Sequence, residues 1–209
     1  MTNLATWLRL MAVTDDLVVG GRDVVALCRD AERGGATSIQ LRMKAVGPAE
    51  LARAARAVIA GVGVPVLVND RVDVALAVGA AGVHLGPDDL PPGRARALAP
   101  PGFIIGASVG SEREAGLAQA ADYWGVGPWA VTATKADAGA AIGGEGFARL
   151  VALAAGRPCV AIGSVRPPDV ASVIDAGGAG VAVVSGIFGA PDAATAAATY
   201  DAAFREALA

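Results

Sequence analysis

The sequence has few of the residues on which several classes of protein depend. Its 209 residues include two cysteines, Cys28 and Cys159, and one histidine, His84. A zinc site built from Cys and His ligands is therefore nearly excluded. So few cysteines, with no signal peptide, indicate a reducing cytoplasm, and both thiols are expected to be small buried hydrophobes. Because aromatic residues make up only 4% of the chain, the core has to be built from Ala, Val, Ile and Leu.

Charge and long apolar runs are also scarce. Charged residues account for 18% of the chain, and 17 basic and 20 acidic side chains leave a net charge of -3. No basic tract indicates nucleic-acid binding. Every apolar stretch is interrupted before the roughly 18 residues that a membrane span needs. We expect a soluble cytoplasmic protein with small-molecule partners, no nucleic-acid partner and no membrane partner; the sequence leaves open whether it is a homo-oligomer.

Short apolar runs alternate with Ala-rich amphipathic stretches along the whole chain. The predicted strands are 8–14, 38–42, 65–69, 82–85, 103–108, 123–127, 159–162 and 181–185. The predicted helices are 23–32 and segments beginning near Pro48, Val72, Pro91, Ser111, Gly144, Pro167 and Pro191, with Ser111 and Glu114 forming a capping box. Continuous apolar strands followed by helices are typical of a parallel sheet covered by helices.

Eight such units close most simply into one α/β domain over residues 1–209, a (β/α)8 TIM barrel. A doubly wound open sheet is the structural alternative. The Gly-rich nucleotide fingerprint of that fold is missing, since Gly20-Gly21 does not fit its spacing. The long segment 127–144 is polar in its middle, and we interpret it as a lid.

Polar side chains follow most of the predicted strands. They are Gln40, Arg42, Lys44, Asn69, Asp70, Asp88, Asp89, Ser108, Thr132, Thr134, Lys135 and Ser185. In a barrel these positions meet at one rim, where reacting groups lie. Three of them are cations suited to a polyanion. The carboxylates of Asp70 and Asp89 are ligands suited to Mg²⁺. Backbone N–H groups at Gly163-Ser164 and Gly186 are suited to a phosphate.

Each of these motifs also has a purely structural interpretation. Arg42 and Lys44 can be solvated loop charges, and the threonines can be turn residues. Asp70 can cap the helix at Val72, and Asp89 the helix at Pro91. His84 lies inside an apolar strand, which favours a packed or hydrogen-bonded barrel residue over a catalyst. The concentration of charged residues at strand ends on one rim favours a functional site.

The same residues resemble the thiamine-phosphate synthase family along nearly the whole chain. The resemblance is carried by 40–44 (QLRMK), 69–71 (NDR), 82–89 (GVHLGPDD), 106–108 (GAS), 122–128, 132–135 (TATK) and 180–185. It implies a transferase that couples a hydroxymethylpyrimidine diphosphate to a thiazole phosphate, giving thiamine phosphate and pyrophosphate. The pyrimidine substrate would ionise to a carbocation, which the thiazole nitrogen captures.

The resemblance also implies roles for individual residues. Arg42, Lys44, Asn69 and Lys135 resemble diphosphate ligands, and Gln40 and Ser108 would contact the pyrimidine or its leaving group. Arg42, Lys44, Lys135 and Ser108 would be the catalytic set, and Asp70 and Asp89 match the ligands of a Mg²⁺ cofactor. Contacts to the thiazole phosphate would come from Thr132, Thr134, Ser164, Val184 and Ser185.

Three positions depart from the family pattern. Met43 replaces an acidic residue, and its side chain is expected to alternate away from the site. Val131 replaces a proline, which would loosen the lid. Ser164 replaces the second glycine of a Gly-Gly-Ile turn, so a positive φ at this residue would be strained.

Two other functions fit the same fold. A thiazole tautomerase is disfavoured because Gly110 stands where its acid-base histidine is expected. A non-catalytic sensor of phosphate ligands would not need metal ligands or a lysine at the leaving group.

Overall fold

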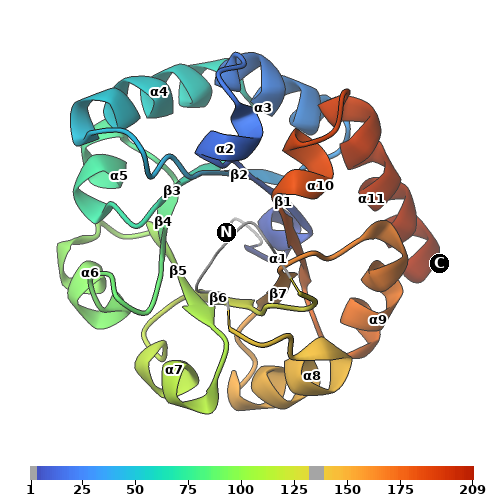
Figure 1. Ribbon diagram of the computed structural model, residues 1–209. Coiled ribbons are helices and arrows are strands. Elements are labelled where there is room, and N and C mark those ends of the chain that lie inside the picture. Colours follow the sequence, from blue (N-terminus) through green and yellow to red (C-terminus); the bar gives the residue numbers. More distant parts are fainter. Residues whose placement is uncertain (1–3, 132–138) are drawn as a thin grey trace.

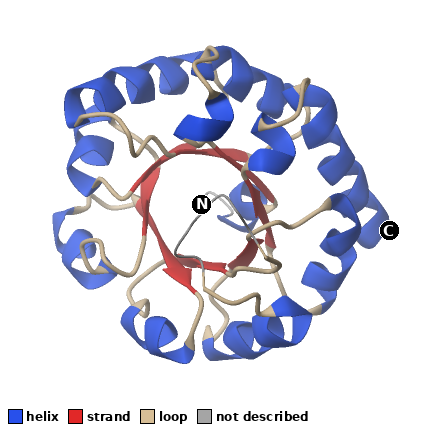
Figure 2. Ribbon diagram, in the orientation of Figure 1, coloured by secondary structure: helices blue, strands red, loops and turns tan. Residues whose placement is uncertain are grey.

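A closed barrel of parallel strands forms the centre of the molecule (Figure 1 and Figure 2). The computed structural model describes residues 4–131 and 139–209. In these residues the strands are β1 (Leu10–Val13), β2 (Ser38–Leu41), β3 (Val66–Asn69), β4 (Gly82–Leu85), β5 (Ile104–Val109), β6 (Tyr123–Val126), β7 (Cys159–Ile162) and β8 (Gly180–Val183). Each strand pairs with the next, and Leu10 of β1 pairs with Val181 of β8 to close the ring. The predicted (β/α)8 barrel is confirmed.

Helices surround this ring. They are α1 (Leu4–Leu8), α2 (Asp16–Val19), α3 (Val24–Arg33), α4 (Pro48–Gly61), α5 (Val72–Val78), α6 (Pro92–Leu98), α7 (Glu112–Leu117), α8 (Gly143–Leu153), the 3-10 turn η1 (Pro167–Asp169), α9 (Val170–Asp175), α10 (Ser185–Phe188) and α11 (Ala193–Ala207). Three of these, α1, α2 and α10, were not predicted. As a consequence Leu8 and Ser185, which were expected in strands, belong to helices instead.

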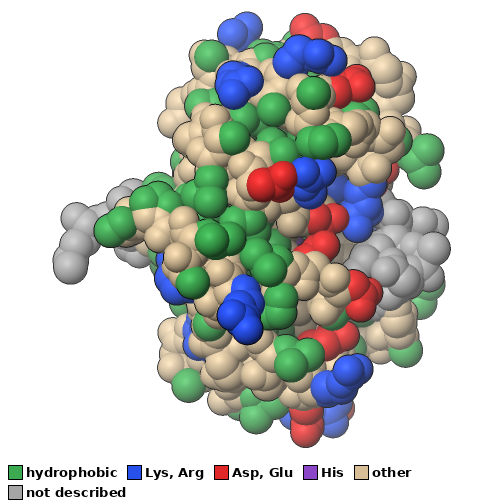
Figure 3. All heavy atoms as spheres, turned by 90° about the vertical axis from the view of Figure 1, so that its left-hand side faces the viewer, with side chains coloured by type: hydrophobic (Ala, Val, Ile, Leu, Met, Phe, Trp, Pro, Cys, Tyr) green, Lys and Arg blue, Asp and Glu red, His purple; other side chains and the backbone are tan. Residues whose placement is uncertain are grey.

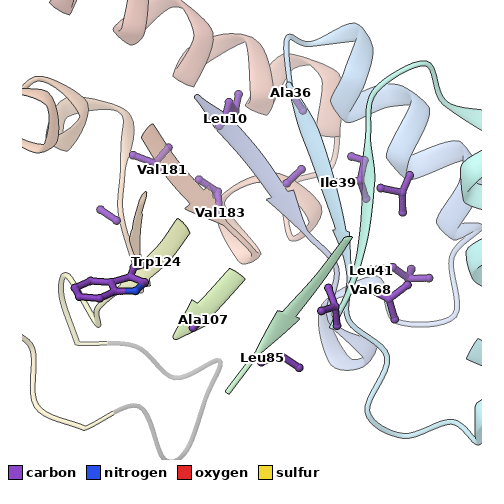
Figure 4. Packing of buried hydrophobic residues seen from close by; sticks show 14 of the residues in the cluster. Leu10, Ala36, Ile39, Leu41, Val68, Leu85, Ala107, Trp124, Val181 and Val183 are labelled. Atoms are coloured by element: carbon purple, nitrogen blue, oxygen red, sulfur yellow. The ribbon is translucent and has the colours of Figure 1, made fainter. Parts of the chain in front are cut away.

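Alternation along the strands divides the core into an outer shell and an interior. Ile39 and Leu41 of β2 and Val68 of β3 point outward and pack beneath the helices (Figure 4). The interior cluster consists of Leu8, Met11, Val13, Leu67, Tyr123, Val160 and Ala182. Since Ile39 and Leu41 face outward, Gln40 between them faces the barrel interior.

Two glycines make room for large side chains inside the barrel. A Cβ atom on Gly106 would lie 2.2 Å from Cζ of Tyr123, and one on Gly125 would lie 2.9 Å from Cε1 of His84. Neither position admits a side chain unless its neighbour moves. The ring of Tyr123 and the imidazole of His84 therefore fill space that the two glycines leave free.

Helix α1 covers the N-terminal end of the barrel. Leu8 is 1% exposed and belongs to the interior cluster. The hydroxyl groups of Thr37 and Ser38, at the start of β2, donate to the carbonyl oxygen of Trp7 at 3.0 and 2.7 Å. Most of the predicted site residues that the structure describes lie at the opposite, C-terminal end. None of the described helices is both long and apolar enough to cross a membrane.

Candidate active site

A lysine and two aspartates meet at the C-terminal ends of β2, β3 and β4. The amine of Lys44 lies 3.0 Å from Oδ2 of Asp70. The carboxyl group of Asp89 lies beside that of Asp70, and burial together with this contact raises the pKa of Asp89. We call Lys44, Asp70 and Asp89 the rim cluster. The predicted convergence of these three residues is observed.

The local backbone explains how the two carboxylates reach each other. Asp70 follows β3 with φ of 64°, a left-handed conformation that Asp tolerates better than most residues. Its N–H donates to the carbonyl of His84 at 2.8 Å, which fixes this turn against β4. Oδ2 of Asp89 accepts from the N–H of Gly86 at 2.7 Å, so the loop after β4 folds back toward Asp70.

Neither aspartate is a helix cap. Helix α5 has Arg71 at its N-cap and α6 has Pro91, and neither helix has a side-chain capping bond at its start. The structural interpretation of Asp70 and Asp89 as caps is therefore wrong. By contrast, Ser111 does cap α7 through the N–H of Glu114 at 3.3 Å, although Glu114 accepts from Gly110 and does not complete the expected box.

The carboxyl group of Asp89 ionises less readily than that of an ordinary aspartate. Burial, followed by the contact with Asp70, raises the pKa of the Asp89 carboxyl above its ordinary value, while Lys44 acts in the opposite direction. Two carboxylates held together repel each other until a cation or a proton lies between them. Within residues 4–131 and 139–209 no group of three or more His, Cys, Asp or Glu residues could hold a metal. A metal at Asp70 and Asp89 would therefore need oxygen ligands from water and substrate.

Arg42 is held by Asp15, a residue that is not among the predicted site residues. Its guanidinium forms an ion pair with Asp15, and the two side chains are 18% and 6% exposed. Asp15 lies in the turn after β1. Most of the predicted site residues likewise follow the C-terminal ends of other strands. The position of Asp15 directly after the first predicted strand, 8–14, is the signal in the sequence that identifies it.

A chain of polar contacts runs through the barrel interior below the rim. Nε2 of His84 lies 3.0 Å from the Ser108 hydroxyl, and its Nδ1 lies 2.9 Å from the Tyr123 hydroxyl. Tyr123 and Nε2 of Gln40 both contact the sulfur of Met11, at 3.9 and 3.3 Å. His84 is therefore the hydrogen-bonded barrel residue that we expected. The chain links Gln40 to Ser108, the two predicted pyrimidine contacts.

The turns after β7 and β8 lie against a common side chain. Ser164 is exposed and has φ of 53°, the positive φ that we considered for this turn. The Tyr200 hydroxyl donates to the carbonyl of Val165 at 2.9 Å, and a Cβ on Gly186 would lie 2.4 Å from the same hydroxyl. Tyr200 therefore connects the turn at Ser164 with the start of α10 at Ser185.

The remaining predicted residues are placed as follows. Asn69 ends β3 and is 9% exposed, and Val184 is the N-cap of α10. Met43 packs partly buried against the outer core, as expected, and Val131 is 85% exposed. Thr132, Thr134 and Lys135 lie outside the described residues, as does the rest of 132–138 within the predicted lid 127–144.

The fold and the rim together define a class of protein. Charged side chains of both signs gather along the right-hand side of Figure 3, which corresponds to the front of Figure 1. A (β/α)8 barrel with a lysine, an arginine and two carboxylates at its C-terminal rim is an enzyme scaffold for phosphorylated small molecules.

Comparison with known proteins gives the particular family. The model of the thiamine monophosphate synthase family matches residues 10–187. A thiamine-phosphate synthase of Xanthobacter autotrophicus is 48% identical over 201 residues, covering 94% of this chain and 95% of the relative. One from Azorhizobium caulinodans is 47% identical over 200 residues, with 92% of each chain covered. The solved thiamine phosphate pyrophosphorylase of Pyrococcus furiosus has a TM-score of 0.88 and 36% identity, covering 99% of this chain and 100% of that one. The chain belongs to the thiamine monophosphate synthase family.

Proposed function

We propose that this chain is a transferase that forms thiamine phosphate from a hydroxymethylpyrimidine diphosphate and a thiazole phosphate, with release of pyrophosphate. The observation that carries the proposal is the rim cluster beside Arg42 in a chain of this family. Both of its free cysteines are buried, which supports a reducing, cytoplasmic location.

The reaction breaks one bond and forms another. The bond between the pyrimidine methylene carbon and the diphosphate oxygen breaks, and its electron pair leaves with pyrophosphate. The lone pair of the thiazole nitrogen then forms the new C–N bond. Negative charge grows on the leaving group, so fixed cations stabilise the transition state more than the ground state. Arg42 and Lys44 supply those cations, together with Lys135.

The pyrimidine is held by the interior chain in this proposal. Gln40 and Ser108 both face the barrel lumen, and Asn69 ends the strand between those of Gln40 and His84. The imidazole of His84 holds the Ser108 hydroxyl, so Ser108 is presented in a fixed orientation. No side-chain nucleophile is needed for this reaction.

Asp70 and Asp89 would hold the magnesium ion. Their paired carboxylate oxygens are the hard ligands that Mg²⁺ prefers, and a site with two protein carboxylates leaves positions for water and substrate phosphate. When bound, the ion supplies positive charge to the departing diphosphate.

The thiazole phosphate would lie at the ends of β7 and β8. Ser164 lies in the turn after β7, and Ser185 begins α10 with Val184 as its N-cap. Tyr200 connects these two segments. Loops after these two strands are the customary phosphate site of the fold. Thr132 and Thr134 complete the proposed set.

A tautomerase would need a histidine at position 110, and the structure leaves no space for one. A Cβ on Gly110 would lie 2.8 Å from the carbonyl oxygen of Gly127. A backbone atom cannot turn aside as a flexible side chain can. The synthase function is therefore the better explanation of this rim.

Incubation with both substrates and Mg²⁺ tests the proposal, with thiamine phosphate and pyrophosphate as the expected products. Asp89→Ala should lower turnover by at least about tenfold, because one of two metal carboxylates is lost. Asp88→Ala is the matched control, since Asp88 is the exposed neighbour of Asp89. A folded wild-type chain that forms no thiamine phosphate, or an Asp89→Ala variant as active as Asp88→Ala at saturating Mg²⁺, contradicts the proposal.

A further inference from the structure

Three consecutive residues after β1 hold the loop that carries Arg42 and Lys44. Thr14, the first of them, is fully buried. Its hydroxyl accepts from the N–H of Arg42 at 2.8 Å and donates to the carbonyl of Arg42 at 3.0 Å. Both backbone groups of Arg42 are therefore satisfied by one side chain, which extends the β1–β2 pairing beyond the last strand residue.

Asp15, the second residue, fixes the Arg42 side chain. Its Oδ2 pairs with Nη1 of Arg42, and its Oδ1 accepts from the N–H of Leu17 at 3.1 Å, capping α2. A guanidinium has five N–H donors, so a contact through one nitrogen leaves others for a second anion. The buried carboxylate orients the arginine without using all of its donors.

Asp16, the third residue, shapes the loop beyond Arg42. Its Oδ2 accepts from the N–H groups of Lys44 at 2.6 Å and Ala45 at 3.0 Å. The backbone at Lys44 is thereby turned so that its amine reaches Asp70. Helix α2, which begins with Asp16, lies in front of the strand ends in Figure 1.

We propose that Asp15 and Asp16 are positioning residues for the diphosphate, although neither touches it. The inference rests on the proposed function, in which Arg42 and Lys44 bind the leaving group. An aspartate beside a substrate-binding arginine lowers the net positive charge that attracts a polyanion. If charge alone mattered, removing Asp15 would tighten diphosphate binding. If the orientation of Arg42 matters more, removing Asp15 weakens diphosphate binding. We infer this second result.

Asp15→Asn separates these possibilities, because asparagine keeps an oxygen that can cap α2 and loses the charge. Calorimetry with pyrophosphate and Mg²⁺ should give a Kd raised by about tenfold to a hundredfold, the range expected for a misplaced binding group. The KM for the pyrimidine diphosphate should rise in parallel, and the KM for the thiazole phosphate should stay within about twofold of the wild-type value. Asp23→Asn is the matched control, since Asp23 caps α3 by the same kind of bond at the surface.

A double-mutant cycle tells positioning from a general structural effect. In an Arg42→Ala background, Asp15→Asn should weaken pyrophosphate binding no further, since the group it orients is gone. Asp16→Ala, which changes a partly exposed residue, gives a second variant should Asp15→Asn fold poorly; it should raise the same Kd.

The outcomes also separate this inference from the proposed function. Tighter or unchanged pyrophosphate binding in Asp15→Asn overturns the positioning role. Additive effects of Asp15→Asn and Arg42→Ala overturn it as well. If Asp15→Asn folds poorly, an unchanged Kd for pyrophosphate in Asp16→Ala overturns it. A wild-type chain that binds pyrophosphate but forms no thiamine phosphate contradicts the proposed function alone. A wild-type chain that binds no pyrophosphate contradicts both.

Discussion

At the scale of single residues, Ser164 is held in a conformation that glycine adopts more easily. Its φ of 53° costs about 1 kcal/mol or more for a residue with a Cβ. Ser164→Gly should relieve this strain and let the turn present its N–H to the thiazole phosphate. We expect a thiazole KM lowered by about fivefold, which corresponds to about 1 kcal/mol, and an unchanged pyrimidine KM, both measured by steady-state kinetics.

The control for Ser164→Gly is Ala155→Gly. Ala155 has φ of 51° and lies between α8 and β7, away from the C-terminal rim. Its glycine variant should gain similar stability without any change in either KM. A higher thiazole KM in Ser164→Gly would mean that the serine hydroxyl itself binds phosphate. If both KM values stay unchanged, the turn is not part of the thiazole site.

Arg42 tests the diphosphate assignment at the same scale. Arg42→Lys keeps the charge and loses the fork that can bond to Asp15 and to a second anion. A lost charge-assisted hydrogen bond is worth roughly 1.5–3 kcal/mol. The pyrimidine KM should therefore rise by about tenfold or more. Arg33→Lys, at a surface ion pair with Asp30, is the control and should be neutral. Equal kinetics for the two variants would mean that Arg42 does not bind the diphosphate.

At the scale of elements, Arg22 joins the two short helices at the C-terminal rim. Its guanidinium donates to the carbonyls of Val18 and Val19 at the end of α2, and to that of Phe188 at the end of α10. These helices carry Asp16 and Ser185 at their starts. Loss of Arg22 should therefore loosen the supports of both substrate sites.

We expect Arg22→Ala to raise the KM values of both substrates by about fivefold, since a net hydrogen bond is worth about 1 kcal/mol. Arg29→Ala provides the control. Arg29 joins α3 to the end of α4 through the carbonyl of Gly61 at 2.8 Å, so its loss should affect stability alone. Kinetics of Arg22→Ala that match those of Arg29→Ala would show that α2 and α10 hold their positions without this contact.

The strands and the longer helices of this chain could be predicted from local patterns, and the shortest helices could not. The expected bounds of β4 and β7 are those observed, and α4 and α5 begin at the predicted Pro48 and Val72. Helices α1, α2 and α10 have four or five residues, too few to show a helical period. Their stability comes from caps and from contacts with the barrel that a local pattern does not contain.

At the scale of the whole molecule, we expect the N-terminal end of the barrel to contribute stability and the C-terminal end to bind the substrates. Leu8 fills the N-terminal end and is 1% exposed. Leu8→Ala should cost roughly 2–5 kcal/mol of stability, because it leaves a cavity in the interior cluster. The KM values should stay unchanged at temperatures where the variant is folded. Thermal unfolding and kinetics check both, with Leu208→Ala as the exposed control. Altered substrate affinity in folded Leu8→Ala would contradict this division.

The closure of the barrel also determines which parts of the site could be predicted from the sequence. Arg42, Lys44, Asp70 and Asp89 follow from one rule, that polar residues at parallel strand ends share a rim. The contact between His84 and Ser108 spans 24 residues and the pair of Asp15 with Arg42 spans 27. Such contacts depend on barrel register and loop path, which emerge only when the ring closes.

The glycines inside the barrel also constrain how a sequence of this kind can change over generations. Gly106 lies against the Tyr123 ring and Gly125 against His84, each too close for an added Cβ. A side chain at 106 fits only when the ring at 123 moves aside or is lost, so a substitution at 106 is easier after one at 123. Because Tyr123 also contacts His84, losing that ring removes a partner of the group that holds Ser108. Steric exclusion thereby couples positions 106 and 123, and relatives with a larger residue at 106 should carry a smaller one at 123.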